Sequence, residues 1–202
     1  MSTITIVRKN GSVAIAADTQ ASFGSRKLSA HYERHAGKIL RIGPSFIGMT
    51  GWGVQQLVLE HLFAALGEVP TLESKNEIFA VLLKVHERLR WDYFLTEQAG
   101  EDDAFESSQL SLMIANSFGI FGVYSNRSVI EFERFWASGS GSDYALGAMY
   151  AVYESAADAL SIAQAGVRAA TEFDDATGAP IESHTLQLSA PSVEELELWL
   201  KL

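Results

Sequence analysis

Two hydroxyl side chains stand at the beginning of the sequence, which opens Met1-Ser2-Thr3 and continues into an apolar run. If Met1 is removed, Ser2 carries a nucleophile and a base in one residue. Its hydroxyl can attack a carbonyl, and its α-amine, with an ordinary pKa of about 7.7 to 8.0, can take up the hydroxyl proton. The start of the chain is therefore a candidate catalytic centre. The alternative is an ordinary first strand that follows the initiator methionine.

A hairpin follows directly, because Asn10-Gly11 lies between two apolar runs and favours a two-residue turn. We expect strands over residues 3–8 and 12–18. The hairpin brings the chain back to its own start, where the second strand ends at Asp18. Taken alone, Asp18 could simply cap that strand.

The composition is that of an acidic, cysteine-free chain of 202 residues, with 48% hydrophobic residues and a net charge of −10. This length suffices for one well-filled core and is short for two, so we expect a single domain over residues 1–202. Nucleic-acid and anionic membrane surfaces need clustered Lys and Arg, which the acidic balance argues against. The lack of cysteine excludes disulfides and thiolate catalysis. Without a secretory segment or a membrane-spanning apolar run, we expect a soluble, cytoplasmic protein.

Apolar periodicity predicts the remaining elements, which alternate between groups of strands and pairs of helices. Helix 54–66 has one apolar face that contains Val54, Leu57, Val58, Leu62 and Ala65, and its opposite face is apolar too. We therefore expect it to be covered on both sides. Ser142 is the expected cap of the third helix. The predicted strands are 39–42, 45–49, 109–115, 120–124, 129–133 and 182–189, and the predicted helices are 54–66, 74–97, 143–155 and 158–172.

Five segments, in this order, resemble the motifs of the proteasome β-type subunits and the bacterial HslV peptidase. They are the terminal hydroxyl residue with the hairpin and Asp18, Gly37-Lys38-Ile39, Gly48-Met49-Thr50-Gly51, Ala137-Ser138-Gly139-Ser140-Gly141-Ser142, and Phe173-Asp174-Asp175-Ala176-Thr177-Gly178. Within the family, the short start is most similar to the bacterial (betaproteobacterial-type) proteasome homologues. The element order alone indicates an α+β fold. The resemblance implies the four-layer αββα sandwich of N-terminal nucleophile hydrolases, with two antiparallel sheets between two helical layers.

The resemblance also implies the catalytic roles. Ser2 would be the nucleophile and its amine the general base, while Asp18 would hold Lys38 charged and oriented beside it. The Gly51 N–H would bind the oxyanion. Three further side chains would surround the terminal amine and position a water: Ser140, Asp174 and Thr177.

Three alternatives stay open at these positions. Thr3 is the other nucleophile, if Ser2 is also removed. Lys38 lies further from Asp18 than is usual in the family, which implies an insertion within residues 28–36 and makes Arg34 the other cation. Asp175 is the other acid for Asp174. Serine replaces the family's usual threonine and lacks the methyl group that fixes the rotamer, so we expect lower or narrower activity.

The resemblance implies a substrate pocket with small and apolar walls, which suggests cleavage after hydrophobic residues. Its expected residues are Ala21, Ser22, Ala36, Leu40, Met49 and Gly53. We expect no cofactor and no metal. His31 and His35 are four apart and could chelate a metal on a helix, but no third ligand accompanies them, so we interpret the stretch as a polar surface loop.

The sequence thus favours a peptidase subunit with an N-terminal Ser or Thr nucleophile, acting on polypeptides inside homo-oligomeric stacked rings. An AAA-type ATPase unfoldase is the partner that the family usually needs for folded substrates. Two other functions remain open, namely a non-catalytic ring or scaffold subunit that keeps Met1, and an N-terminal nucleophile amidohydrolase for small amides. Whether a ring has six or seven subunits is not written in the sequence.

Overall fold

The computed structural model describes residues 2–51, 53–67, 69–94, 107 and 110–189. Within these ranges the chain forms two main antiparallel sheets and four α-helices, which confirms the predicted α+β class. None of the helices in this part of the chain is long and apolar enough to cross a membrane.

The first sheet has the start of the chain near its centre, in the order β10-β1-β2-β11. Its two central strands are joined at Asn10-Gly11, where both residues adopt positive φ, 50° and 73°. This is the backbone of a type I′ turn, for which the Asn-Gly pair is suited. The strands are β1 (Thr3–Lys9), β2 (Ser12–Asp18), β10 (Phe135–Gly139) and β11 (Ile181–Gln187).

The second sheet runs in the order β5-β6-β7-β8-β9, so each strand pairs with its neighbour in the chain. A short separate hairpin follows β2 and precedes β5 in the chain. It pairs β3 (Ala21–Phe23) with β4 (Arg26–Leu28). The second sheet consists of β5 (Ile39–Ile42), β6 (Ser45–Thr50), β7 (Ser111–Asn116), β8 (Gly119–Val123) and β9 (Val129–Phe132).

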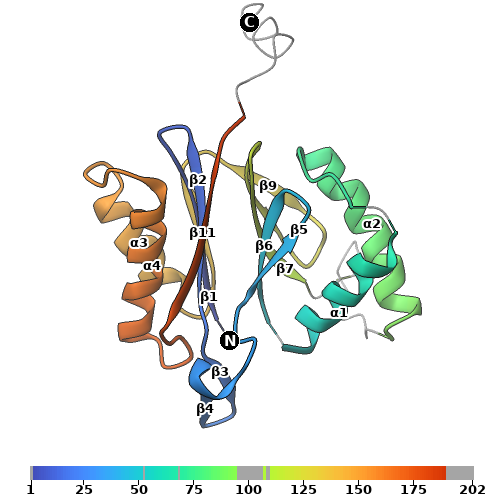
Figure 1. Ribbon diagram of the computed structural model, residues 1–202, viewed down its shortest axis with the longest axis horizontal. Coiled ribbons are helices and arrows are strands. Elements are labelled where there is room, and N and C mark those ends of the chain that lie inside the picture. The colour runs from blue at the N-terminus through green and yellow to red at the C-terminus, as the bar shows by residue number, and fades with distance from the viewer. Residues whose placement is uncertain (1, 52, 68, 95–106, 108–109, 190–202) are drawn as a thin grey trace, which may run out of the picture.

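The helices lie on the outer faces of the two sheets (Figure 1). One pair, α3 and α4, covers the first sheet, and the other pair, α1 and α2, covers the second sheet, so the sheets face each other between them. The start of β1 lies at one end of this stack, next to the β3–β4 hairpin. The helices are α1 (Gly53–Ala65), α2 (Lys75–Trp91), α3 (Ser142–Val152) and α4 (Ala159–Phe173).

β1 is buried on both faces from Thr3 to Val7, and within this stretch isoleucines alternate with threonines. Ile4 and Ile6 belong to the cluster between the two sheets, whereas Val7 packs toward α3 and α4. Each fully buried isoleucine contributes about 1.5 to 3 kcal/mol. On the helical side the Thr5 hydroxyl donates to the Ala163 carbonyl of α4 at 3.0 Å, a close approach that the small residues of this helix allow. The first strand is thereby held between two cores.

Two predicted helix ends differ from the structure. The helix expected over 74–97 ends at Trp91, with Asp92 as its C-cap and in an ion pair with Arg88 at 3.0 Å. The last residues of that prediction, 95–97, lie outside the described residues. Ser142 is the first residue of α3 rather than its cap, and Gly141 takes the capping position without a side-chain bond.

Two elements were not predicted. β10 falls partly in the Gly-Ser segment expected to be a loop, yet it pairs with β1 along its full length, from Thr3 opposite Gly139 to Val7 opposite Phe135. The β3–β4 hairpin lies in the stretch expected to be irregular. That stretch also contains a single 3₁₀ turn at Ala30–Tyr32, so His31 and His35 do not share an α-helical face.

The expectation that α1 is covered on both sides is not met by the described residues of this chain. Val54 and Leu57 are 63% and 65% exposed, and the buried residues are Gln55, Leu59 and Leu62. Periodicity could not choose between two apolar faces, and the face containing Leu59 packs on the second sheet. The helix is therefore covered on one side only within this chain, and its other side presents apolar side chains.

Candidate active site

The sheet register brings Ser2 to the ends of two neighbouring strands. Thr3 lies opposite Gly139 of β10, and Ile4 lies opposite Ala17 of β2, so the residue before β1 is next to the ends of both strands. Ser2 is buried, and its carbonyl oxygen accepts a hydrogen bond from the Ser140 N–H at 2.9 Å.

Gly139 makes this arrangement sterically possible. Its φ is +104°, and a Cβ at this position would overlap the Ser2 carbonyl oxygen and approach Cγ2 of Thr50 to 3.1 Å. Only glycine adopts this conformation readily and leaves that space empty. The end of β6 therefore lies against the end of β10, beside Ser2.

Asp18 is the central acceptor of the site and is fully buried, with 0% exposure. Its Oδ1 accepts from the Thr3 N–H at 2.9 Å and from Lys38 Nζ at 2.7 Å. Its Oδ2 accepts from the N–H groups of Gln20 and Gly178, both at 3.1 Å. Four donors suit the ionised carboxylate, which accepts only. Asp18 thus links the backbone of β1 directly to the lysine.

Lys38 is nearly buried, with 12% of its side chain exposed. Besides Asp18, its Nζ donates to the Gln20 carbonyl at 2.6 Å. Burial lowers the pKa of Lys38 from its ordinary value of 10.5, against the opposing effect of Asp18, Glu33 and Asp174.

Hydroxyl groups next to Ser2 form a second set of hydrogen bonds, which ends at Asp174. Thr3 Oγ1 and Thr177 Oγ1 are 2.7 Å apart, and Thr177 donates onward to Asp174 Oδ2 at 2.5 Å. Ser140 Oγ donates to the same carboxylate oxygen at 2.7 Å. Of the three residues expected around the terminal amine, Ser140 and Thr177 both bond to Asp174. Thr177 connects this group to Thr3, the residue after Ser2.

Asp174 is the C-cap of α4, and its pKa is lowered from the ordinary value of 3.8. Burial raises the pKa of Asp174, but hydrogen bonds from Thr177 and Ser140, with a smaller one from the Ala176 N–H, outweigh burial. The carboxylate is therefore ionised at neutral pH and able to hold a cationic amine nearby.

The alternative residues lie elsewhere or are engaged in other bonds. Arg34 is exposed, and it is Lys38 that contacts Asp18. Asp175 is exposed, and it is its carbonyl that accepts from Gln20 Nε2, at 2.9 Å.

Thr3, the other hydroxyl residue, is fully buried. Its N–H donates to Asp18 and its hydroxyl is bonded to Thr177. Both of its reactive groups are therefore occupied while Ser2 precedes it.

Gly51 follows β6 at a φ of +137°, where a side chain would collide with Oε1 of Gln55 in α1. The preceding Thr50 hydroxyl lies 3.1 Å from the Ser138 hydroxyl of β10. The glycine loop thus starts at the strand end that adjoins Ser2.

The six expected pocket residues are divided by their burial. Leu40 and Met49 belong to the core cluster under α1 and α2, so they could form only the floor of a pocket. Ala21, Ser22 and Ala36 are half-buried and Gly53 is exposed. The Ser22 hydroxyl oxygen is buried without a hydrogen-bond partner among the described residues.

Sequence reasoning missed Gln20. Its backbone N–H donates to Asp18 and its side chain donates to the loop after α4, where a Cβ on Gly178 would come within 3.0 Å of the Gln20 Cβ. Its position two residues after Asp18 was the only available signal, because the contact with the distant loop depends on the pairing of β2 with β11.

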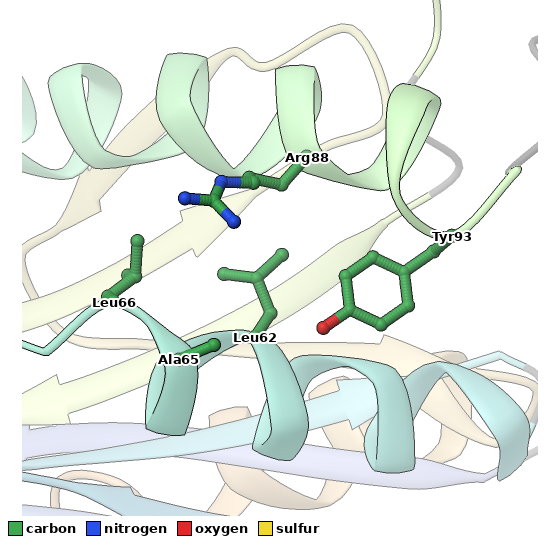
Figure 2. A pocket seen from close by; sticks show the side chains of 5 residues that line it. All are labelled: Leu62, Ala65, Leu66, Arg88 and Tyr93. Atoms are coloured by element: carbon green, nitrogen blue, oxygen red, sulfur yellow. The ribbon is translucent and has the colours of Figure 1, made fainter.

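A separate hollow lies between α1 and α2 (Figure 2). Tyr93 points into it, and the Tyr93 hydroxyl is 2.6 Å from Nδ1 of His61. None of its lining residues is among the predicted site residues. They are Leu62, Ala65, Leu66, Arg88 and Tyr93.

Solved structures resemble this chain over nearly its whole length. Thiobacillus denitrificans BPH is 46% identical, covers 94% of this chain and 100% of its own, and superposes with a TM-score of 0.89. The same protein in complex with epoxomicin is 46% identical over 93% of this chain and 100% of its own, with a TM-score of 0.87. Eukaryotic HslV from Trypanosoma brucei is 25% identical, with 92% and 99% coverage and a TM-score of 0.67.

No family model and no curated protein matches the chain. The structural relatives nevertheless agree with the motifs and the geometry, since both are proteasome-type N-terminal nucleophile peptidases. At 46% identity over 93% of its length, this chain belongs to the proteasome-type N-terminal nucleophile peptidase family, as a self-compartmentalising peptidase subunit similar to the bacterial proteasome homologues.

Proposed function

We propose that the chain hydrolyses peptide bonds with Ser2 as the nucleophile, after removal of Met1. The observation that carries this proposal is the Asp18 carboxylate, which binds both the Thr3 N–H and Lys38 Nζ. One buried charge thereby fixes the strand that carries Ser2 and orients the lysine expected beside it. The engaged hydroxyl and N–H of Thr3 favour Ser2 over Thr3.

In the proposed reaction, the Ser2 hydroxyl oxygen attacks the substrate carbonyl while its proton passes to the Ser2 α-amine. The tetrahedral intermediate collapses when the amine returns this proton to the leaving nitrogen, which leaves an ester on Ser2. Water then attacks the ester, its proton passing again to the amine, and releases the acid product. Lys38 lowers the pKa of the nucleophile and amine by its charge, and Asp18 keeps it oriented.

The other roles complete this reaction. The Gly51 N–H would stabilise the oxyanion of both intermediates. Ser140, Asp174 and Thr177 would hold the terminal amine and its water, for which their shared hydrogen bonds are suitably placed. Cleavage after hydrophobic residues is proposed from the apolar pocket residues Leu40 and Met49.

We further propose the assembly that encloses this site. Subunits would form stacked homo-oligomeric rings, fed by an AAA-type ATPase unfoldase, and the exposed apolar side chains of α1 and α2 support a subunit contact. Val54, Leu57, Phe79 and Leu83 are the exposed residues concerned. The four-layer αββα description, the single domain over residues 1–202 and the cytoplasmic location belong to the same proposal.

Intact mass measured before and after treatment with epoxomicin tests the chemistry. The epoxyketone group forms a stable ring only with a free α-amine and an adjacent hydroxyl. We expect loss of Met1 and an adduct of one inhibitor per subunit on Ser2, confirmed by fragmentation. A Ser2→Ala variant that has lost Met1 is the matched control and should form no adduct.

The other outcomes discriminate between the remaining functions. Retention of Met1 without an adduct would favour a non-catalytic ring subunit. An adduct on a small, monomeric species by size exclusion would favour an amidohydrolase for small amides. An adduct that begins at Thr3 would identify Thr3 as the nucleophile.

A further inference from the structure

Glu182 contacts the backbone of the lysine from the opposite sheet. Its Oε2 accepts a hydrogen bond from the Lys38 N–H at 2.9 Å. Glu182 lies in β11, opposite Ala17, and the preceding Ile181 lies opposite Asp18. Asp18 and Glu182 therefore come from neighbouring positions of the first sheet. Asp18 bonds to the ammonium of Lys38 and Glu182 to its backbone N–H.

The residue before Lys38 makes room for this contact. A Cβ on Gly37 would lie 2.8 Å from Glu182 Oε2, which is closer than a side chain tolerates. The Gly37 carbonyl accepts from Gln56 Nε2 of α1 at 3.1 Å. The Gly37-Lys38 dipeptide is thus held between α1 and β11.

The Glu182 carboxylate is itself held in place. Its Oε1 lies 3.1 Å from Nε2 of His184, and the His184 ring stacks on Phe46 of β6 at 4.3 Å with an interplanar angle of 13°. The Glu182 side chain is only 24% exposed, and the contacts described here are made by its carboxylate oxygens. Its contacts orient groups rather than fill the core.

We propose that Glu182 is a positioning residue, which sets the place of Lys38 through the backbone hydrogen bond. The lysine side chain is long and flexible, so its ammonium is well placed only if its backbone is fixed as well. Asp18 and the Gln20 carbonyl hold the ammonium end. Glu182 holds the backbone end by accepting from the Lys38 N–H. The Lys38 carbonyl also accepts from the Met49 N–H at 3.3 Å.

This inference rests on the catalytic role proposed for Lys38. Burial lowers the pKa of Lys38, and the acidic groups that oppose burial are Asp18, Glu33 and Asp174. Glu182 bonds to the backbone N–H of Lys38 rather than to its ammonium, so we expect its effect to fall on the position of Lys38.

Peptidase kinetics of the assembled full-length protein test the inference. We expect Glu182→Ala to lower kcat about tenfold with KM unchanged within about twofold, since a small displacement of a catalytic group slows chemistry more than binding. Glu182→Gln keeps an acceptor oxygen and should recover kcat to within about threefold of wild type. Glu172→Ala, an exposed carboxylate of α4, is the matched control and should change neither constant.

Amide hydrogen exchange of the Lys38 N–H, followed by mass spectrometry, supplies a measurement independent of activity. Exchange should be faster in Glu182→Ala than in wild type, Glu182→Gln and Glu172→Ala. Unchanged exchange, unchanged kcat in Glu182→Ala, or a Gln variant as slow as the Ala variant would each overturn the inference. If wild type forms no epoxomicin adduct, the proposed function fails, and exchange alone decides whether Glu182 positions Lys38.

Discussion

Two aspartates flank the start of β1, and the fold holds them in opposite ways. Asp18 is fully buried and receives three backbone N–H groups and one ammonium. Asp174 lies at the end of α4 and receives two hydroxyls and one backbone N–H. Backbone donors cannot rotate, whereas hydroxyls can reverse donor and acceptor roles. Asp18 is therefore a fixed anchor, while Asp174 belongs to a network that can pass protons.

Asp18→Asn should have the largest effect, because it removes the anchor's charge. The Lys38 ammonium would lose its buried partner, and breaking a buried ion pair costs about 3 to 5 kcal/mol. We expect a lower unfolding temperature and peptidase turnover near background. Thermal unfolding and a fluorogenic peptide assay measure the two effects, with Asp143→Asn on the exposed start of α3 as control. Wild-type turnover in Asp18→Asn would contradict the anchor role.

Lys38→Arg comes next, because it keeps the charge but changes its shape. The planar guanidinium is larger than an ammonium and does not fit between the two acceptors that Lys38 Nζ reaches, so the charge would be displaced. We expect kcat to fall about 100-fold, as for loss of one preorganised charged group. Lys84→Arg, exposed on α2, should leave kcat unchanged. An arginine variant as fast as wild type would mean that position 38 needs only a positive charge.

Asp174→Asn should have a smaller effect that falls on catalysis rather than stability. Its hydroxyl partners can turn toward the amide oxygen, so we expect a stability loss of about 1 kcal/mol and a decrease in kcat of about tenfold. Asp175→Asn is the matched control on the neighbouring exposed residue. If Asp174→Asn unfolds as readily as Asp18→Asn, the contrast between anchor and network is wrong.

Ser140→Ala should have the smallest effect at neutral pH and a visible one in acid. It removes one of the hydrogen bonds that hold the pKa of Asp174 below 3.8 against burial. A lowered carboxyl pKa gives a stabilisation that is present above pH 3.8 and lost as pH falls through the folded-state value.

In Ser140→Ala that loss should begin at higher pH, because the pKa of Asp174 rises. A profile of kcat/KM against pH would show its acidic limb displaced upward, with neutral activity within about threefold of wild type. The same substitution at the exposed Ser155 hydroxyl is the control. An acidic limb that does not move would separate Asp174 from the catalytic pH dependence.

The sequence predicted best where local chemistry decides the structure. Asn10-Gly11 predicted the central hairpin because its backbone conformation is local. β10 was missed because its Ala-Ser-Gly end has no strand signal of its own. Its pairing with β1 joins residues more than a hundred positions apart, which periodicity cannot reveal. Periodicity did not show which face of α1 packs on the second sheet, because both faces are apolar.

In the site, too, residues that belong to local motifs were predicted, and residues whose contacts depend on strand register were not. Asp18, Lys38, Ser140, Asp174 and Thr177 were named from motifs, and the structure brings them together around Ser2 and Thr3. Gln20 and Glu182 were not named, since their contacts cross between β2, β11 and the segment before β5. Such residues become visible only when strand register is known.

The hydrogen bonds that hold the start of β1 begin at the Ser2 carbonyl and continue through Thr3. All of them can form before the α-amine of Ser2 exists. Under the mechanism proposed above, folding and activation are then separate events in time: the new subunit can reach its native structure as an inactive precursor, and removal of Met1 afterwards would create the catalytic base.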